Sequence, residues 1–258
     1  MQSFEPVRIR GLLRRAWGLY RSSWRRMAPP ALVLSLPLFL IPVIAYLLWG
    51  GGRVPNALGA GIYFARESLL QLGGSALVTA GAVVMTDRLR GRDTRVSEAV
   101  ARLRPQRSAV MVAALYSVML GLAGNLLQAF ALVLPVLLLG PPVLAQVVAL
   151  ENQGTATAVP RAGKLLKGNV LRVLGSLFPL LLGVRVLELG LYFAVFASLN
   201  VGGVDQLAAL GLIEGVLRGV VAGTVILPFA AALSLAAYLD LRARMEQFDL
   251  ETLAAEAL

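Results

Sequence analysis

The segment Ser108–Leu150 runs for about 43 residues without one charged side chain. One helix needs about 20 residues to cross a bilayer, so we expect a hairpin of two spanning helices with its turn near Gln128–Ala131. Charged residues make up only 15% of the chain, against about 25% in soluble domains. This run therefore predicts an all-α, polytopic membrane protein.

Four further apolar runs are long enough to cross a membrane. They are Met27–Gly52, Ile62–Thr86, Val170–Leu199 and Leu212–Leu239. With the hairpin they predict six transmembrane helices in a single integral membrane domain, residues 1–258. Pro37 and Pro42 in the first run predict kinks or a break, and Pro228 lies inside the last run. The turn-rich stretch Gly50–Ala60 predicts a loop between the first two helices.

Basic segments precede the first, third and fifth runs, and each predicts a short amphipathic elbow helix. The first lies within residues 1–28, the second has an apolar face around Val96–Leu103, and the third is Thr157–Asn169. We expect Asp93 or Thr94 to cap the second helix and Thr157 to cap the third. Cations on these helices suit a surface of anionic lipid, although a solvated face is the alternative. These cations are Arg14, Arg15, Arg21, Arg25, Arg161, Lys164 and Lys167.

The distribution of basic residues predicts an orientation. The net charge is +10, and most arginines flank apolar runs on the side of the three elbows, whereas the alternate loops hold almost none beyond Arg53. This pattern follows the positive-inside rule and is unlike a nucleic-acid-binding surface. It predicts a multi-pass protein of the cytoplasmic (inner) membrane, with both termini in the cytoplasm.

The order of elbow, span and span occurs three times. The units cover residues 1–90, 91–151 and 152–245, and a charged tail covers 240–258. The exits TDRLRG after the second span and LDLRAR after the sixth look alike. Parallel repeats of this kind predict a pseudo-threefold bundle, while two-span hairpins joined by chance would also look repetitive.

Six charged residues lie within or at the edge of the apolar runs. They are Arg66, Glu67, Arg185, Glu188, Glu214 and Arg218. All fall towards the outer face in the predicted topology. One hypothesis is an outward-facing polar cavity for a lipid head group or solute, with Arg185 and Arg218 as anion ligands. The alternative is a set of ion pairs that fix helix packing, because two of these pairs are three or four residues apart.

The composition argues against an enzyme. The chain has no Cys and no His, which excludes thiol chemistry, Cys/His metal sites and histidine-based acid–base catalysis. It contains neither HExxH nor GxSxG. We therefore expect no catalytic residues, no metal and no cofactor.

Two stretches resemble a known bacterial family. In PPVLAQVVALENQGTATAVPRAGKLLKGNVLRVLG the matching positions are Glu151, Ala158, Arg161, Gly168 and Asn169, with Ala162 where serine is usual. The C-terminal AAYLDLRARMEQFDLETL matches at Asp240, Arg242, Arg244 and Asp249. The chain is similar there to the glycerophosphoryl diester phosphodiesterase membrane domain and related uncharacterised polytopic proteins. The resemblance implies a membrane domain only, because the phosphodiesterase domain needs histidines.

The expected function is that of a non-enzymatic membrane scaffold or accessory protein. It would contact anionic membrane lipids, or a protein partner, through its cytoplasmic elbows. The alternative is a transporter, channel or lipid-handling protein, which proline-broken spans and outer charges would suit. Flux or lipid transfer in liposomes would separate the two.

Overall fold

The structure is a computed structural model that describes residues 8–48, 56–126, 140–151, 153–176, 183, 186, 190, 193 and 207–246. The secondary structure in these ranges is helical, which confirms the all-α prediction for this part of the chain. The helices are α1 (Ile9–Leu48), α2 (Asn56–Leu89), α3 (Val96–Leu103), the 3₁₀ turn η1 (Arg104–Gln106), α4 (Arg107–Leu126), α6 (Gly140–Leu150), α7 (Thr155–Leu166), α9 (Leu207–Val221), the π-helical η4 (Ala222–Ile226) and α10 (Leu227–Glu246). A further helical segment, 170–176, follows α7.

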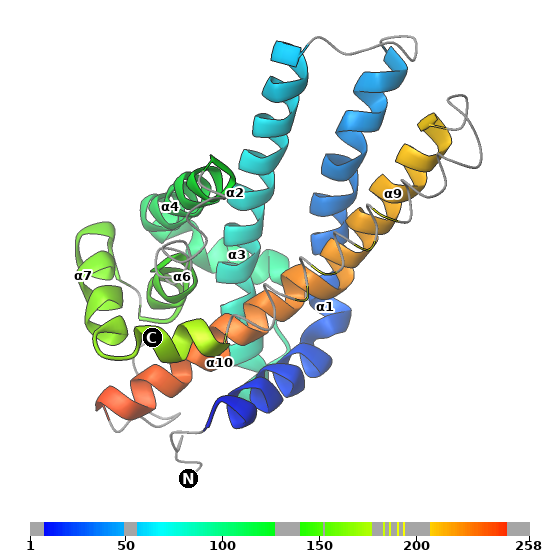
Figure 1. Cartoon of the computed structure of the whole chain (residues 1–258). Coiled ribbons are helices and arrows are strands. Elements are labelled where there is room, and N and C mark those ends of the chain that lie inside the picture. The colour runs from blue at the N-terminus through cyan, green and yellow to red at the C-terminus, as the bar shows by residue number, and fades with distance from the viewer. Residues whose placement is uncertain are drawn as a thin grey trace.

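The molecule has two ends, which Figure 1 shows at the top and the bottom. The end of α1 and the starts of α2 and α9 lie at the top. The start of α1, α7 and the end of α10 lie at the bottom, which we call the charged end. An ion pair between Arg26 and Asp93 holds the loop after α2 beside α1 near this end.

Within the described residues, three helical stretches are long and apolar enough to cross a membrane. They are Ile9–Ala45, Phe64–Leu89 and Ile213–Glu246. α4 and α6 belong to the two arms of the expected hairpin, and they contact each other. The expected turn between them, at Gln128–Ala131, lies outside the described residues. Most of the expected fifth span lies outside them too. The count of six spans and the threefold repeat stay predictions.

The first elbow and the first span form one helix, not two. α1 runs without interruption from Ile9 to Leu48 and contains four prolines, Pro29, Pro30, Pro37 and Pro42. Its ribbon changes direction between the dark blue start and the upper part in Figure 1. A proline removes one backbone hydrogen bond and bends a helix, and packing of α1 along α2, α9 and α10 holds it together through the bend. Similarly, α2 begins at Asn56, inside the stretch expected to be loop.

The last long helix is distorted just before Pro228. The π-helical turn η4 immediately precedes it, and α9, η4 and α10 follow one another without a break. A proline at 228 has no N–H to donate to the carbonyl of Thr224, four residues earlier. That carbonyl instead accepts hydrogen bonds from α1, from the Tyr20 hydroxyl at 3.1 Å and from the Trp24 indole at 2.9 Å. The aromatic residues of the first elbow therefore fasten α1 to the distorted turn.

We expect Tyr20→Phe to lower the free energy of unfolding by about 0.5–1.5 kcal/mol, the usual net value of one hydrogen bond. The measurement is thermal unfolding of the detergent-solubilised protein. Tyr116→Phe is the matched control, because Tyr116 is exposed on α4 and its loss of a hydroxyl should leave the melting temperature unchanged. Equal melting temperatures for the two variants would contradict the contact with Thr224.

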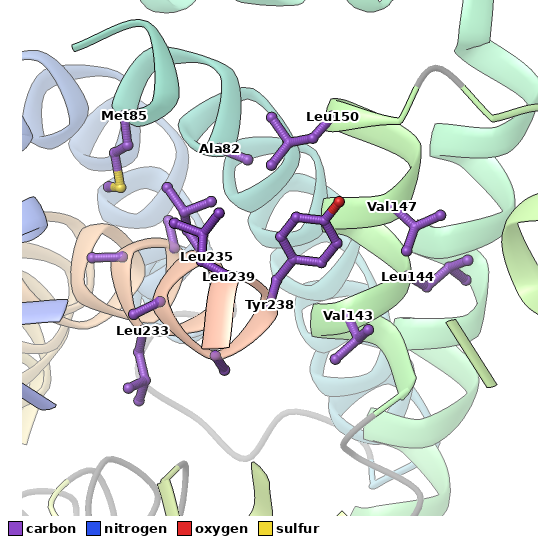
Figure 2. Close-up of a cluster of buried hydrophobic side chains, with 14 of the residues drawn as sticks. Ala82, Met85, Val143, Leu144, Val147, Leu150, Leu233, Leu235, Tyr238 and Leu239 are labelled. Carbon is purple, nitrogen blue, oxygen red and sulfur yellow. The ribbon is translucent and has the colours of Figure 1, made fainter. Parts of the chain in front are cut away.

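The main core lies where α10 and α6 pack against α2. Figure 2 shows Leu235 and Leu239 of α10 beside Met85 and Ala82 of α2, and Tyr238 reaching from α10 towards α6. The Tyr238 side chain is fully buried, and its hydroxyl lies at the Leu150 end of α6. The core therefore ends, at the last turn of α6, in a polar group that needs a partner.

The apolar faces of the second and third elbows belong to this protein interior. Ala99 and Leu103 of α3 are buried, as are Ala158, Ala162 and Leu165 of α7. These residues pack on neighbouring helices, so they are not available to insert into lipid. Val100 of α3 and Val159 of α7 stay exposed beside them.

Candidate functional site

Four of the six charges predicted at the outer edge are described, and they form pairs within single helices. Arg66 of α2 donates to Glu67 at 2.6 Å, and its guanidinium lies over the ring of Phe39 in α1. Arg218 of α9 contacts Glu214, one turn away, at 2.5 Å. The remaining two, Arg185 and Glu188, lie outside the described residues.

The cations of the three elbows differ in their exposure and in their partners. Arg14, Arg21 and Arg25 are exposed on α1, and Lys164 and Lys167 are exposed at the end of α7, as expected for cations at a membrane surface. Arg15 is half-buried. Arg161, expected on the outer face with the two lysines, instead turns inward to two carboxylates.

Arg161 belongs to a network that the sequence did not predict as a site. Glu151, directly after α6, accepts a hydrogen bond from Arg161 Nε at 2.7 Å and another from the Tyr238 hydroxyl at 2.8 Å. Arg242 of α10 donates to the Tyr238 oxygen at 3.3 Å and to Glu246 at 2.8 Å. Glu246 also pairs with Arg161. The side chains of Glu151 and Arg242 are only 6% and 3% exposed, so each depends on the other groups for compensation.

Hydrogen bonding keeps Arg161 of this network protonated. The pKa of Arg161 is raised above its ordinary value, chiefly because Glu246 accepts from its guanidinium, with burial opposing and Glu151 adding to the rise. Arg161 therefore carries its charge permanently. The network joins the end of α6, the middle of α7 and the last turns of α10, and it is suited to fixing their positions.

A second buried carboxylate, Asp240, lies one turn from Arg244 on α10. It is 1% exposed and accepts from Arg244 at 3.0 Å. It also accepts from Arg172, in the helical segment 170–176, at 2.8 Å. The turn that leads into that segment has Gly168 at φ +78°, and Asn169 begins it by accepting from the N–H of Val173. Glycine is a natural helix stop, and α7 ends just before Gly168 as its residue type predicts. The side-chain amide of Asn169 donates to the Lys167 carbonyl and to the sulfur of Met245, so it does not cap the next helix.

Both predicted caps are wrong in position. The N-cap of α7 is Gly154, and Thr157 lies inside the helix with its hydroxyl donating to the Gly154 carbonyl. The N-cap of α3 is Arg95, whose N–H donates to Glu98. Thr94 is drawn away from capping because its hydroxyl donates to the buried carboxylate of Asp87 at 2.5 Å. A tertiary charge thus outcompetes a local capping bond.

A third buried carboxylate, Asp87, organises the turn after α2. Besides Thr94, its side chain accepts from Arg102 at 2.6 Å. The chain turns at Gly91, which has φ +74°, a value that favours glycine. Backbone bonds from Arg92 to the Asp87 carbonyl and from Gly91 to the Arg88 carbonyl close a Schellman motif. This turn sets Arg90 and Arg92 beside Arg102.

These residues line a cavity of about 350 Å³ at the end of α2. Its polar wall holds Arg90, Arg92, Arg102, Asp87, Thr86 and Gln106, and its apolar wall holds Val83, Leu103, Pro105, Ala149 and Leu150. Burial lowers the pKa of Arg90, with Arg92 and Arg102 adding to the fall and Asp87 opposing it. The cavity therefore concentrates positive charge in a partly enclosed space.

Within the described ranges, no group of three or more Asp or Glu side chains is placed to hold a metal ion. The three buried carboxylates, Asp87, Glu151 and Asp240, each contact an arginine instead. The signal that could have identified them is their shared position in the sequence. Each directly follows an apolar run, namely Ile62–Thr86, Ser108–Leu150 or Leu212–Leu239.

No family model, curated protein or solved structure matches this chain. The resemblance to the glycerophosphoryl diester phosphodiesterase membrane domain stays a prediction. Of the positions that carry it, Glu151 and Arg161 form an ion pair, and Asp240 and Arg244 form another.

Proposed function

We propose that this chain is a non-enzymatic scaffold or accessory protein of the bacterial cytoplasmic membrane, which binds anionic lipid at its charged end. One observation carries the proposal. The buried acidic residues of that end are neutralised by arginines that point inward, while Lys164, Lys167, Arg14, Arg21 and Arg25 point outward. The accessible charge that remains is strongly cationic.

The spacing of charges along the long helices supports a position in the bilayer. Residues 68–86 of α2 carry no charge between Glu67 and Asp87, and residues 219–239 carry none between Arg218 and Asp240. Roughly 20 helical residues cover the ~30 Å hydrocarbon core. A bilayer with its hydrocarbon between these two layers of charge would leave both layers at the lipid head groups.

The basic end would then face the cytoplasm, following the positive-inside rule. In this position α3 and α7, whose apolar faces are mostly packed against the protein, act as rigid platforms. They present lysines and arginines to phosphate groups of the same leaflet. The scaffold needs no catalytic group, and the three buried carboxylates described at this end, Asp87, Glu151 and Asp240, each contact an arginine.

The test compares lipids that stay bound to the protein. We expect the protein released from nanodiscs of equal phosphatidylglycerol and phosphatidylcholine to retain phosphatidylglycerol preferentially in native mass spectrometry. The double variant Lys164→Gln, Lys167→Gln should lose about 2 kcal/mol of this preference at low salt, because each cation near an anionic surface contributes about 1 kcal/mol.

Arg53→Gln is the control, since Arg53 belongs to a loop expected on the other face and lies outside the described residues. It should retain the preference of the unmodified protein. High salt should weaken the preference by screening. Equal retention of both lipids by the unmodified protein would contradict the proposal.

A further inference from the structure

We propose that the cavity at the end of α2 is a binding site for one phosphate group, held by Arg90, Arg92 and Arg102. The proposal rests on the proposed function for the source of that phosphate, a glycerophospholipid head group, but not for the phosphate chemistry itself. Three arginines and one aspartate on its wall leave a formal charge of +2. Arginine is the side chain whose planar fork best matches phosphate oxygens.

Polar groups that lack a partner mark the cavity as incomplete. Arg90 Nε and Nη2 are buried without a hydrogen-bond partner in the described part of the chain, and its closest carboxylate oxygen, on Asp87, is 3.9 Å away. The hydroxyl of Thr86, a residue only 2% exposed, is likewise buried without a partner. Burying such groups without a partner is costly, so a ligand that accepts hydrogen bonds would remove the cost.

Asp87 shows why the ligand must be an anion. Its carboxylate is already engaged by Thr94 and Arg102. The remaining donors on Arg90 have no negative partner of their own within hydrogen-bond distance. A phosphate would supply oxygens to Arg90 and Thr86 and offset the repulsion among the three arginines.

The position of the cavity suits a lipid phosphate. Val83, Thr86, Asp87 and Arg90 follow one another along one side of α2, so the cavity begins beside the apolar part of the helix and ends beyond it. Leu103, Pro105 and Leu150 add an apolar wall. Its volume of about 350 Å³ lies at the small end of the ~300–1,000 Å³ that ligand pockets occupy. It can accept a phosphate and the first carbons of a glycerol ester, with the acyl chains outside.

The experiment titrates the detergent-solubilised full chain with inorganic phosphate, with glycerol 3-phosphate and with dihexanoyl phosphatidate below its micellar concentration, by isothermal calorimetry. We expect binding of at least one of them. Tighter binding of dihexanoyl phosphatidate than of the other two identifies a lipid, and equal binding of inorganic phosphate identifies a free anion. Absence of binding by all three would overturn the site.

Two variants separate a binding role from a structural one. Arg90→Gln should weaken binding by about 10- to 100-fold, the usual loss for a charged hydrogen bond. Thr86→Val keeps the shape of the side chain and should weaken binding several-fold. Thr86→Val removes a buried hydroxyl without a partner, and Arg90→Gln relieves the repulsion of Arg90 by Arg92 and Arg102. The ligand-free variants should therefore melt at the same temperature as the unmodified protein or higher. A merely structural role predicts the reverse, namely lower melting temperatures with unchanged affinity.

Arg104→Gln is the matched control, because Arg104 is exposed in η1 and does not line the cavity. Its affinity should stay within twofold of the unmodified protein. If Arg90→Gln and Arg104→Gln weaken binding equally, the effect is general charge and the site is refuted. The preference for phosphatidylglycerol, which depends on Lys164 and Lys167, is measured separately, so either proposal can fail while the other stands.

Discussion

Gly219→Leu is expected to lower the melting temperature of the solubilised protein by about 6–12 °C. A Cβ atom at Gly219 would lie 2.8 Å from the Cα of Leu36 in α1. Because the clash is with backbone and not with a flexible side chain, it can be relieved only by moving α9 away from α1. Overpacking of this kind costs about 3 kcal/mol at the upper end of its usual range, which converts to that shift for a chain of this size. The readout is tryptophan fluorescence during heating.

The cause is a row of glycines that brings α9 and η4 against α1. Gly215, Gly219 and Gly223 recur every four residues, and added Cβ atoms would lie within 3.0 Å of Phe39, Leu36 and Leu32 respectively. The buried hydroxyl of Ser35 donates to the Gly219 carbonyl at 2.7 Å across this contact. Such small-residue rows permit close approach of helices in membranes, where the hydrophobic effect does not drive helices together.

Gly61→Leu is the control for this prediction. Gly61 lies on α2, and a Cβ atom there would meet nothing within 4 Å. Leucine is also a better helix former than glycine, so the melting temperature should be unchanged or slightly higher. Equal melting temperatures for the Gly219→Leu and Gly61→Leu variants would refute the close contact of α9 with α1.

Glu151→Gln is expected to destabilise the protein by about 3–5 kcal/mol, the usual cost of removing one member of a buried ion pair. The neutral amide would leave Arg242, only 3% exposed, without the negative charge of Glu151 at 3.8 Å. It would also place an amide where Arg161 now finds a carboxylate at 2.7 Å. Thermal unfolding and the yield of monodisperse protein in detergent measure the effect.

Glu98→Gln is the matched control, because Glu98 is exposed on α3 and glutamine also completes a capping box. It should have almost no effect. A double-mutant cycle with Arg242→Gln adds a sharper test: in the Glu151→Gln background the second substitution should cost less than it does alone. Strictly additive losses would show that the two residues do not stabilise each other.

These two predictions describe how a chain with so few charges maintains one arrangement of helices. Close glycine contacts act along the apolar length of α1 and α9, and a network of buried ions joins the end of α6, the middle of α7 and the last turns of α10. The first needs no polar group, and the second uses polar groups only where the apolar runs end. The phosphate site proposed at Asp87 and Arg90 occupies the corresponding place at the end of α2.

The amino-acid sequence by itself determined the helical class, the long apolar helices and the stop at Gly168. Each depends on local properties: the absence of charge over a spanning length or the conformational freedom of glycine. The sequence also placed Glu214 and Arg218 one turn apart, and helix geometry alone pairs them at 2.5 Å. These features need no knowledge of which helices are neighbours.

Tertiary structure alone decided which way Arg161 turns, which residue caps α3 and whether α1 continues past its prolines. Arg161 has the same local pattern as Lys164 and Lys167, yet it turns inward because α6 and α10 bring Glu151 and Glu246 beside it. Thr94 gives up the cap of α3 because Asp87 is a stronger acceptor within reach. α1 continues through its four prolines because neighbouring helices hold both halves. In each case the deciding partner is distant in sequence or supplied by another helix, and the free energy of a buried charge or a packed face exceeds the local preference.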